Sequence, residues 1–289
     1  MILNKEIRAL ISLLEDPDRD VFSVVSNRLI AQGISILPIL EESLPYAKTG
    51  FHAERIEYVQ QRVHFLNVLY HLTEWEKNGA SDLLQGLLIL CRYRYPMLTM
   101  EEISDPINHI CSDIWLEMHD DLNALEKVAI INNVIYEVYG FSGGTRAFPS
   151  IFDTHINVVL SQKKGSAVVL AILYLIIAQK LNLPIEAFRF ADKVLLLGYL
   201  DSVRKNDQDS KKKILFYIHP FSKGIVFGKS ELERVLNEKD ISPDRSFTKP
   251  CSYKEILMCL LSNLSAAYEQ EGLHLRLQDT KKMIDALMS

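Results

Sequence analysis

Apolar residues recur at helical spacing through the first ~80 positions of the chain. The first two apolar stripes consist of Ile7, Leu10, Ile11 and Leu14, and of Val21, Val24, Val25 and Leu29. Asp16-Pro17-Asp18 separates the two stripes, because proline suits the first turn of a helix and aspartate complements its positive N-terminus. A short helix over 36–44 and a long helix over 53–75 are predicted next. This part of the chain is therefore predicted to be entirely helical.

The most apolar run of the sequence covers residues 167–178 and carries no charge. It is too short to span a bilayer, and it predicts a buried core helix over 167–181 with Ser166 as its N-cap. Four short apolar segments follow and are typical of strands. They cover residues 185–190, 194–200, 214–218 and 225–227. We therefore expect a small antiparallel sheet packed against the core helix.

The remaining segments are predicted to be helical. They cover residues 82–93, 103–115, 125–139, 230–236, 252–270 and 275–288. The predicted fold class is α+β and predominantly α. We expect three domains, namely a helical region over 1–88, a core over 89–240 and a C-terminal helical hairpin over 241–289.

Composition and charge narrow the function classes. The chain has 289 residues, of which 48% are hydrophobic, and this share is ordinary for a globular protein with a substantial core. Its formal net charge is −5, whereas nucleic-acid binding usually needs a basic surface. We therefore expect neither a nucleic acid nor an anionic membrane as a partner. The first 18 residues lack the apolar core of a signal peptide, so we expect a cytoplasmic protein.

The residues that most often bind metals are scattered in this sequence. The four cysteines, Cys91, Cys111, Cys251 and Cys259, form no Cys-x-x-Cys pair, and we expect them to be reduced. His64 and His71 share one face of the long N-terminal helix, but the sequence offers no third ligand beside them. We therefore expect no metal and no cofactor.

The order of helix start, strand and strand is the layout of papain-like and transglutaminase-like sites. In such sites a thiol lies at the N-terminus of a buried helix, where the helix dipole and unpaired amides lower the pKa of the thiol. A histidine on an adjoining strand acts as the base, and an Asp or Asn on the next strand orients that histidine.

The sequence resembles the SirB-type branch of the transglutaminase-like superfamily over most of its length. Four segments carry the resemblance: Ile131-Asn-Asn-Val-Ile-Tyr-Glu-Val-Tyr-Gly-Phe141, Val159-Leu-Ser-Gln-Lys-Lys-Gly165, Ala171-Ile-Leu-Tyr-Leu-Ile-Ile-Ala-Gln-Lys-Leu-Asn-Leu-Pro184 and Ile218-His-Pro-Phe-Ser-Lys-Gly224. The first helices also resemble a HEAT-type repeat, and the last two resemble a tetratricopeptide unit. The resemblance implies a papain-like core between these helical parts.

The resemblance also locates the positions of the superfamily's catalytic triad. The Cys position falls on Ala167, the His position on Lys193 and the Asp position on His219. Alanine offers no nucleophile, and a charged lysine is no base. Ser166 lies one residue from the nucleophile position, and the helical turn directs its side chain about 100° away. We call Ser166, Ala167, Lys193 and His219 the vestigial site.

Two hypotheses about function follow. In the first, the chain is a non-catalytic, transglutaminase-like binding or scaffold protein whose partners are other proteins. In the second, it is a residual hydrolase or acyl-transferase with a rearranged site that uses Ser166, Lys193 or His219. The second hypothesis requires a nucleophile and a base within hydrogen-bond reach in one cleft.

Overall fold

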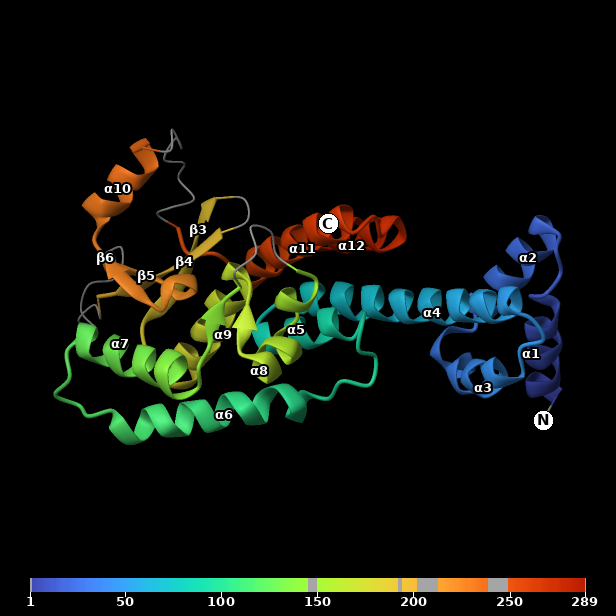
Figure 1. Ribbon diagram of the computed structural model, residues 1–289, viewed down its shortest axis with the longest axis horizontal. Helices are drawn as coiled ribbons and strands as arrows, with labels where there is room; N and C mark the ends of the chain where they lie inside the picture. The colour runs from blue at the N-terminus through green and yellow to red at the C-terminus, as the bar shows by residue number, and fades with distance from the viewer. Residues whose placement is uncertain (1, 145–149, 192–193, 202–212, 239–248, 289) are drawn as a thin grey trace. The chain divides into compact units, whose positions relative to one another are not determined.

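The computed structural model describes residues 2–144, 150–191, 194–201, 213–238 and 249–288. Contacts divide the chain into two compact units. The first unit combines Met1–Glu74 with Arg92–Met97, and the second combines Trp75–Cys91 with Leu98–Ser289. Figure 1 colours the chain from its N-terminus to its C-terminus.

The first unit is helical, as the spacing of its apolar residues predicts. Its elements are α1 (Ile2–Leu13), α2 (Arg19–Ile30), η1 (Gly33–Ile36), α3 (Leu37–Ser43), η2 (Leu44–Tyr46) and most of α4 (Gly50–Lys77). The side chain of Asp18 caps α2 by accepting from the backbone N–H of Asp20. Leu14, Leu29 and Ile56 are among the fully buried side chains of this unit's core. The apolar stripes therefore pack against one another within the unit.

The second unit combines helices with a four-stranded sheet. Its helices are α5 (Leu83–Cys91), α6 (Met100–Glu117), α7 (Ala124–Asn132), η3 (Asn133–Val138), η4 (Phe152–Thr154), α8 (Ile156–Gln162), α9 (Ala167–Lys180), η5 (Pro220–Ser222), α10 (Lys229–Glu238), α11 (Tyr253–Gln270) and α12 (His274–Met288). Its strands are β1 (Ser142–Gly143), β2 (Lys164–Gly165), β3 (Ile185–Ala191), β4 (Val194–Leu200), β5 (Ile214–His219) and β6 (Ile225–Phe227). The predicted fold class, α+β and predominantly α, is confirmed.

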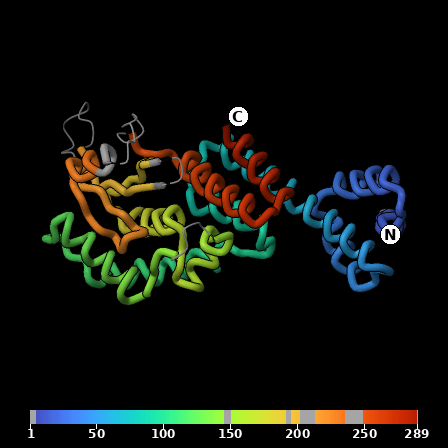
Figure 2. Tube along the Cα trace, turned by 45° about the horizontal axis from the view of Figure 1, so that its top comes forward, coloured from blue at the N-terminus to red at the C-terminus, as the bar shows by residue number. Residues whose placement is uncertain are grey.

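The sheet has the strand order β3-β4-β5-β6, and every neighbouring pair is antiparallel. Helix α9 packs against β3 and β4, and it also contacts α6, α8 and α11 (Figure 1). Residues 168–178 are all buried, so α9 is the core helix that its uncharged sequence predicts. Figure 2 shows α11 and α12 side by side, which confirms the predicted C-terminal helical hairpin.

The structure departs from the sequence prediction between residues 125 and 165. The single helix predicted over 125–139 is α-helical only to Asn132 and continues as the π-helix η3. The strands β1 and β2 and the short helix α8 were not predicted. Each is seven residues or shorter, so its sequence holds too few repeats to reveal a period.

Hydropathy also bears on membrane insertion. Among the described residues, no single helix combines the length and apolar character needed to cross a membrane. One pair of segments, Arg19–Ile30 and Gly33–Tyr46, reaches that length and character only when taken together, and it is bent by 108°.

Candidate functional site

Helix α9 begins at Ala167, the residue that the sequence resemblance aligns with the superfamily's nucleophile. Ser166 is the N-cap, and its Oγ accepts a hydrogen bond from the backbone N–H of Val169 at 3.4 Å. The N–H of Ser166 donates to the carbonyl oxygen of Asp153 at 2.8 Å. Ser166 is buried, whereas Ala167 is half-buried. The predicted capping role of Ser166 is therefore confirmed, and its hydroxyl is oriented toward the helix backbone.

Two short parallel strands hold the segment that precedes α9. Ser142 pairs with Lys164, and Gly143 pairs with Gly165. Gly143 must be a glycine here, because a Cβ atom at this position would lie 2.6 Å from the ring of Phe221. The ring of Phe221, in η5, therefore lies against β1, whose partner β2 ends two residues before Ala167.

His219 is the last residue of β5 and is half-buried. Its Nδ1 lies 2.7 Å from the Oγ of Ser222, and its ring lies edge-on to Phe221 with a centroid separation of 6.4 Å. The following turn, η5, contacts both α9 and β1. These contacts link the turn beside His219 to the elements that flank Ala167. Lys193 lies outside the described residues, so its expected place beside α9 stays a prediction.

A network of side chains positions the turn that follows His219. Asn132 donates from Nδ2 to the carbonyl oxygen of Gly224 at 2.8 Å, and the Tyr174 hydroxyl donates to Oδ1 of Asn132 at 3.1 Å. The Tyr136 hydroxyl donates to the carbonyl oxygen of Pro220 at 2.8 Å. Gly224 has a φ of +69°, and a Cβ atom there would lie 2.0 Å from Oδ1 of Asn132. The turn is therefore fixed from α7, η3 and α9 at once.

Burial keeps the hydroxyl groups of Tyr136 and Tyr174 in the form that donates a hydrogen bond. Burial raises the pKa of Tyr136 and the pKa of Tyr174 well above the ordinary value of 10.0. Both hydroxyls therefore keep their protons and can donate the hydrogen bonds described above. Asn132 and Tyr136 lie in the segment that carries the family resemblance, and Tyr174 and Gly224 lie in two others. The sequence interpretation missed this shared scaffolding role, although the four-residue spacing of Asn132 and Tyr136 is a signal of one helical face.

Burial disfavours the thiolate form of three of the four cysteines. Burial raises the pKa of the Cys91 thiol to about 12, and of the Cys111 and Cys251 thiols to about 11. For Cys251, desolvation and the charge of Glu255 both disfavour the thiolate. Cys251 also lies next to the sheet, since its N–H donates to the carbonyl oxygen of Ala187 at 2.7 Å. None of the four cysteines, all of which lie in the described part of the chain, forms a disulfide.

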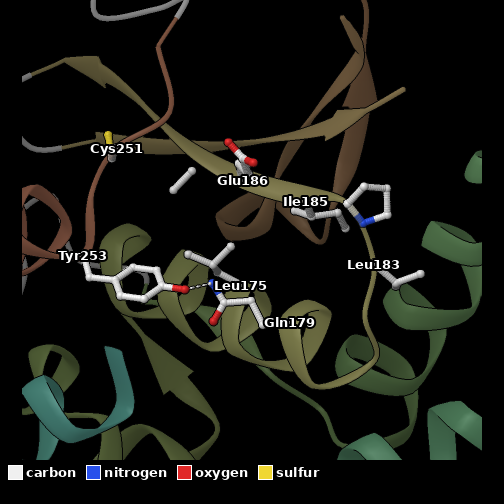
Figure 3. Close-up of a pocket in the computed structure, with 9 residues that line it drawn as sticks. Leu175, Gln179, Leu183, Ile185, Glu186, Cys251 and Tyr253 are labelled. Atoms are coloured by element: carbon white, nitrogen blue, oxygen red, sulfur yellow. Dashed lines mark hydrogen bonds between the residues drawn. The ribbon is translucent and has the colours of Figure 1, made fainter. Parts of the chain in front are cut away.

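A pocket of about 340 Å³ lies near the C-terminal end of α9. It is lined by Leu175, Gln179, Leu183, Pro184, Ile185, Glu186, Ala187, Cys251 and Tyr253. Figure 3 shows the Gln179 amide and the Tyr253 hydroxyl pointing toward each other, and Nε2 of Gln179 donates to that hydroxyl at 3.0 Å. In the same view the Glu186 carboxylate points away from this pair. The pocket therefore combines apolar side chains with the polar groups of Gln179, Tyr253 and Glu186.

Metal chemistry has no evident place in the described part of the chain. No group of three or more His, Cys, Asp or Glu residues is arranged there to hold a metal ion. Burial lowers the pKa of His64, and the charge of Glu41 partly opposes this shift. His64 therefore favours its neutral form.

Comparisons with known proteins agree with this architecture. A UPF0162 protein of Xylella fastidiosa (strain 9a5c) is 22% identical over 192 residues, and a UPF0162 protein of Buchnera aphidicola is 29% identical over 190 residues. The first alignment covers 64% of each chain, and the second covers 64% of this chain and 65% of the relative. The chain thus aligns with slightly less than two thirds of these relatives' length. No solved structure matches it. Residues 101–262, more than half of the chain, match the transglutaminase-like superfamily, and the chain belongs to that superfamily.

Proposed function

We propose that this chain is a non-catalytic, SirB-type member of the superfamily that acts as a binding or scaffold module for another protein. One observation carries the proposal: α9 begins with Ala167, and the hydroxyl of the preceding residue, Ser166, is the buried cap of that helix. Acyl transfer in this fold needs a nucleophile at the helix start, where the helix dipole stabilises negative charge. A methyl group cannot serve that purpose.

The neighbouring groups support the same conclusion. Ser166 would have to leave its hydrogen bond with the Val169 amide before it could attack a substrate. A reactive serine also needs a base within hydrogen-bond reach, and Nδ1 of His219 pairs with Ser222. The hydrogen bonds from Asn132 and Tyr136 nevertheless keep the turn after His219 in a fixed shape. A fixed shape without a nucleophile suits recognition better than catalysis.

Activity and labelling assays test the proposal. The purified chain is incubated with a glutamine-containing peptide and a fluorescent amine, and separately with p-nitrophenyl acetate. A serine-directed fluorophosphonate probe is added in parallel. We expect neither turnover above the rate of heat-unfolded protein nor labelling of Ser166. Affinity purification from the source cells, read by mass spectrometry, is expected to recover one partner with both the wild type and His219→Ala.

Two matched variants make the labelling test specific. Ser166→Ala removes both the hydroxyl and the cap, and it is expected to cost about 0.5–2 kcal/mol of stability. Ser166→Asn removes the hydroxyl but keeps a capping oxygen, so a loss of activity in that variant cannot be blamed on the helix start. Turnover or labelling that disappears in both folded variants would overturn the proposal in favour of a residual hydrolase or acyl-transferase at Ser166, Lys193 or His219.

A further inference from the structure

The negative charge of this chain is concentrated in one stretch of the sequence. Residues 95–126 contain eight acidic residues and no lysine or arginine, whereas the formal charge of the whole chain is only −5. The acidic residues are Glu101, Glu102, Asp105, Asp113, Glu117, Asp120, Asp121 and Glu126. This stretch forms α6, the connection after it and the first turn of α7. The connection between the two helices is visible in Figure 1.

Two large apolar side chains lie exposed at the end of α6. The helix packs into the second unit through Ile103, Ile107, Ile110 and Ile114, which are fully buried. Trp115 and Leu116 follow this stripe on the outward face, and they are 68% and 70% exposed. Leu125, in the first turn of α7, is 54% exposed. Exposed tryptophan beside exposed leucine is unusual on a monomer's surface and is typical of interfaces.

Carboxylates flank these side chains in the sequence, and several form no ion pair with a described residue. Asp113 accepts from the Tyr139 hydroxyl at 2.7 Å, and Glu126 accepts from the Asn123 N–H at 2.8 Å. Glu117, Asp120 and Asp121 are exposed, and they form no ion pair with any residue that the structure describes. The charges of these three carboxylates are therefore not neutralised by an ion pair with any described residue.

We propose that the corner formed by residues 113–126 docks a basic, amphipathic segment of another protein. Lysine or arginine side chains of that segment would pair with Glu117, Asp120 and Asp121, and its apolar side chains would cover Trp115 and Leu116. A second copy of this chain would bring the same carboxylates together, and an anionic membrane would repel them. The inference rests on the proposed function, because it states the chemistry of the partner that a binding module would recognise.

Tryptophan fluorescence gives a direct test. The chain has two tryptophans, and Trp75 is only 8% exposed. In the Trp75→Phe protein, Trp115 alone reports on the corner. The probes are an amphipathic helical peptide of leucine and lysine, and the same peptide with glutamate in place of lysine. We expect the lysine peptide to shift Trp115 emission to the blue and protect it from acrylamide, with an affinity that falls as salt is raised. The glutamate peptide is expected to do neither.

Surface variants locate the binding. The triple variant Glu117→Gln, Asp120→Asn, Asp121→Asn is expected to weaken binding of a fluorescein-labelled lysine peptide roughly tenfold. The matched control Glu269→Gln, Glu271→Gln, Asp285→Asn removes the same charge from exposed positions of α11, α12 and the turn between them, and it is expected to bind like the wild type. Trp115→Ala with Leu116→Ala is expected to weaken binding while the charge stays intact.

Several outcomes would overturn the inference. The first is equal binding of the lysine and glutamate peptides, and the second is an equal loss of binding in the corner triple variant and in the control triple variant. The third is protection of Trp115 that grows with protein concentration alone. The fourth is protection of Trp115 by phospholipid vesicles. The third outcome would indicate a second copy and the fourth a membrane. Failure here is distinguishable from failure of the proposed function, because turnover by the chain would disprove its non-catalytic character and leave peptide binding unaffected.

Discussion

The two ends of helix α9 differ in what surrounds them. At the N-terminal end, Ser166 caps the helix, and side chains from α7 and η3 fix the turn after His219 through backbone carbonyls. At the C-terminal end, Gln179 and Tyr253 lie on the wall of a pocket of about 340 Å³. Residues 167 and 179 are separated by roughly 18 Å along the helix.

This difference concerns structural support at one end of α9 and a pocket at the other. The N-terminal end is held in a fixed shape by hydrogen bonds, and Ala167 stands where the family resemblance places the nucleophile. The pocket at the other end is lined by apolar and polar side chains, including a thiol whose pKa burial raises to about 11. The following experiments test how far the two ends depend on one another.

The largest expected effect lies in the body of α9, which both ends share. Leu173 is fully buried, and Leu173→Ala is expected to lower the free energy of unfolding by ~2–5 kcal/mol through lost burial and a residual cavity. Chemical denaturation measures this loss. The exposed Lys281→Ala on α12 is the control, and it is expected to change stability by less than about 0.5 kcal/mol. Similar small effects at both positions would mean that α9 is not the core of this unit.

The next effect tests the N-terminal end. Gly224→Ala places a methyl group against Asn132 at a positive φ, so we expect a loss of about 1–3 kcal/mol. Asn132→Ala removes two hydrogen bonds and is expected to cost about 1–3 kcal/mol. Thermal or chemical unfolding measures both losses.

The double variant sharpens this test. Asn132→Ala relieves the clash that Gly224→Ala creates. The loss of stability in the double variant is therefore expected to be smaller than the sum of the two single losses by about 0.5 kcal/mol or more. Strict additivity would show that the two residues do not act together on this turn.

A smaller effect is expected at the C-terminal end. Tyr253→Phe removes the acceptor of the Gln179 amide and is expected to cost about 0.5–1.5 kcal/mol. Tyr46→Phe, at a highly exposed hydroxyl, is the control and is expected to be neutral. A loss as large as that of Leu173→Ala would mean that the pocket wall, rather than the helix body, stabilises this region.

The smallest expected effect concerns the thiols. The raised pKa values of Cys111 and Cys251, about 11 each, leave little thiolate at neutral pH. Iodoacetamide is therefore expected to modify both more slowly than free cysteine at pH 8, and the rate is expected to rise as the pH approaches the raised pKa values. Mass spectrometry follows each site. A cysteine that reacts rapidly at neutral pH, with loss of partner binding, would contradict the assignment of inert thiols.

Much of the fold follows from local pattern. The uncharged run from Ala167, the serine before it and the alternating segments after it were sufficient to predict α9, its cap and the four-stranded sheet. The π-helix η3 could not be predicted in this way, because an α-helix and a π-helix share the same apolar residues over six positions. The vestigial site was located only by resemblance, and the role of Asn132, Tyr136 and Tyr174 was missed because their hydrogen-bond partners lie 42 to 92 residues away in the sequence.

The sequence by itself determined most of the helices, the four strands of the sheet and the serine cap of α9, and it determined that residue 167 is an alanine. These properties depend on residue type and on spacing within one element. The tertiary structure alone decided that Asn132 meets Gly224 across 92 residues, that Cys251 lies against β3, and that Trp115 remains exposed while Ile114 is buried. Such contacts depend on how distant elements pack, and hydrophobic periodicity specifies a buried face without specifying what covers it.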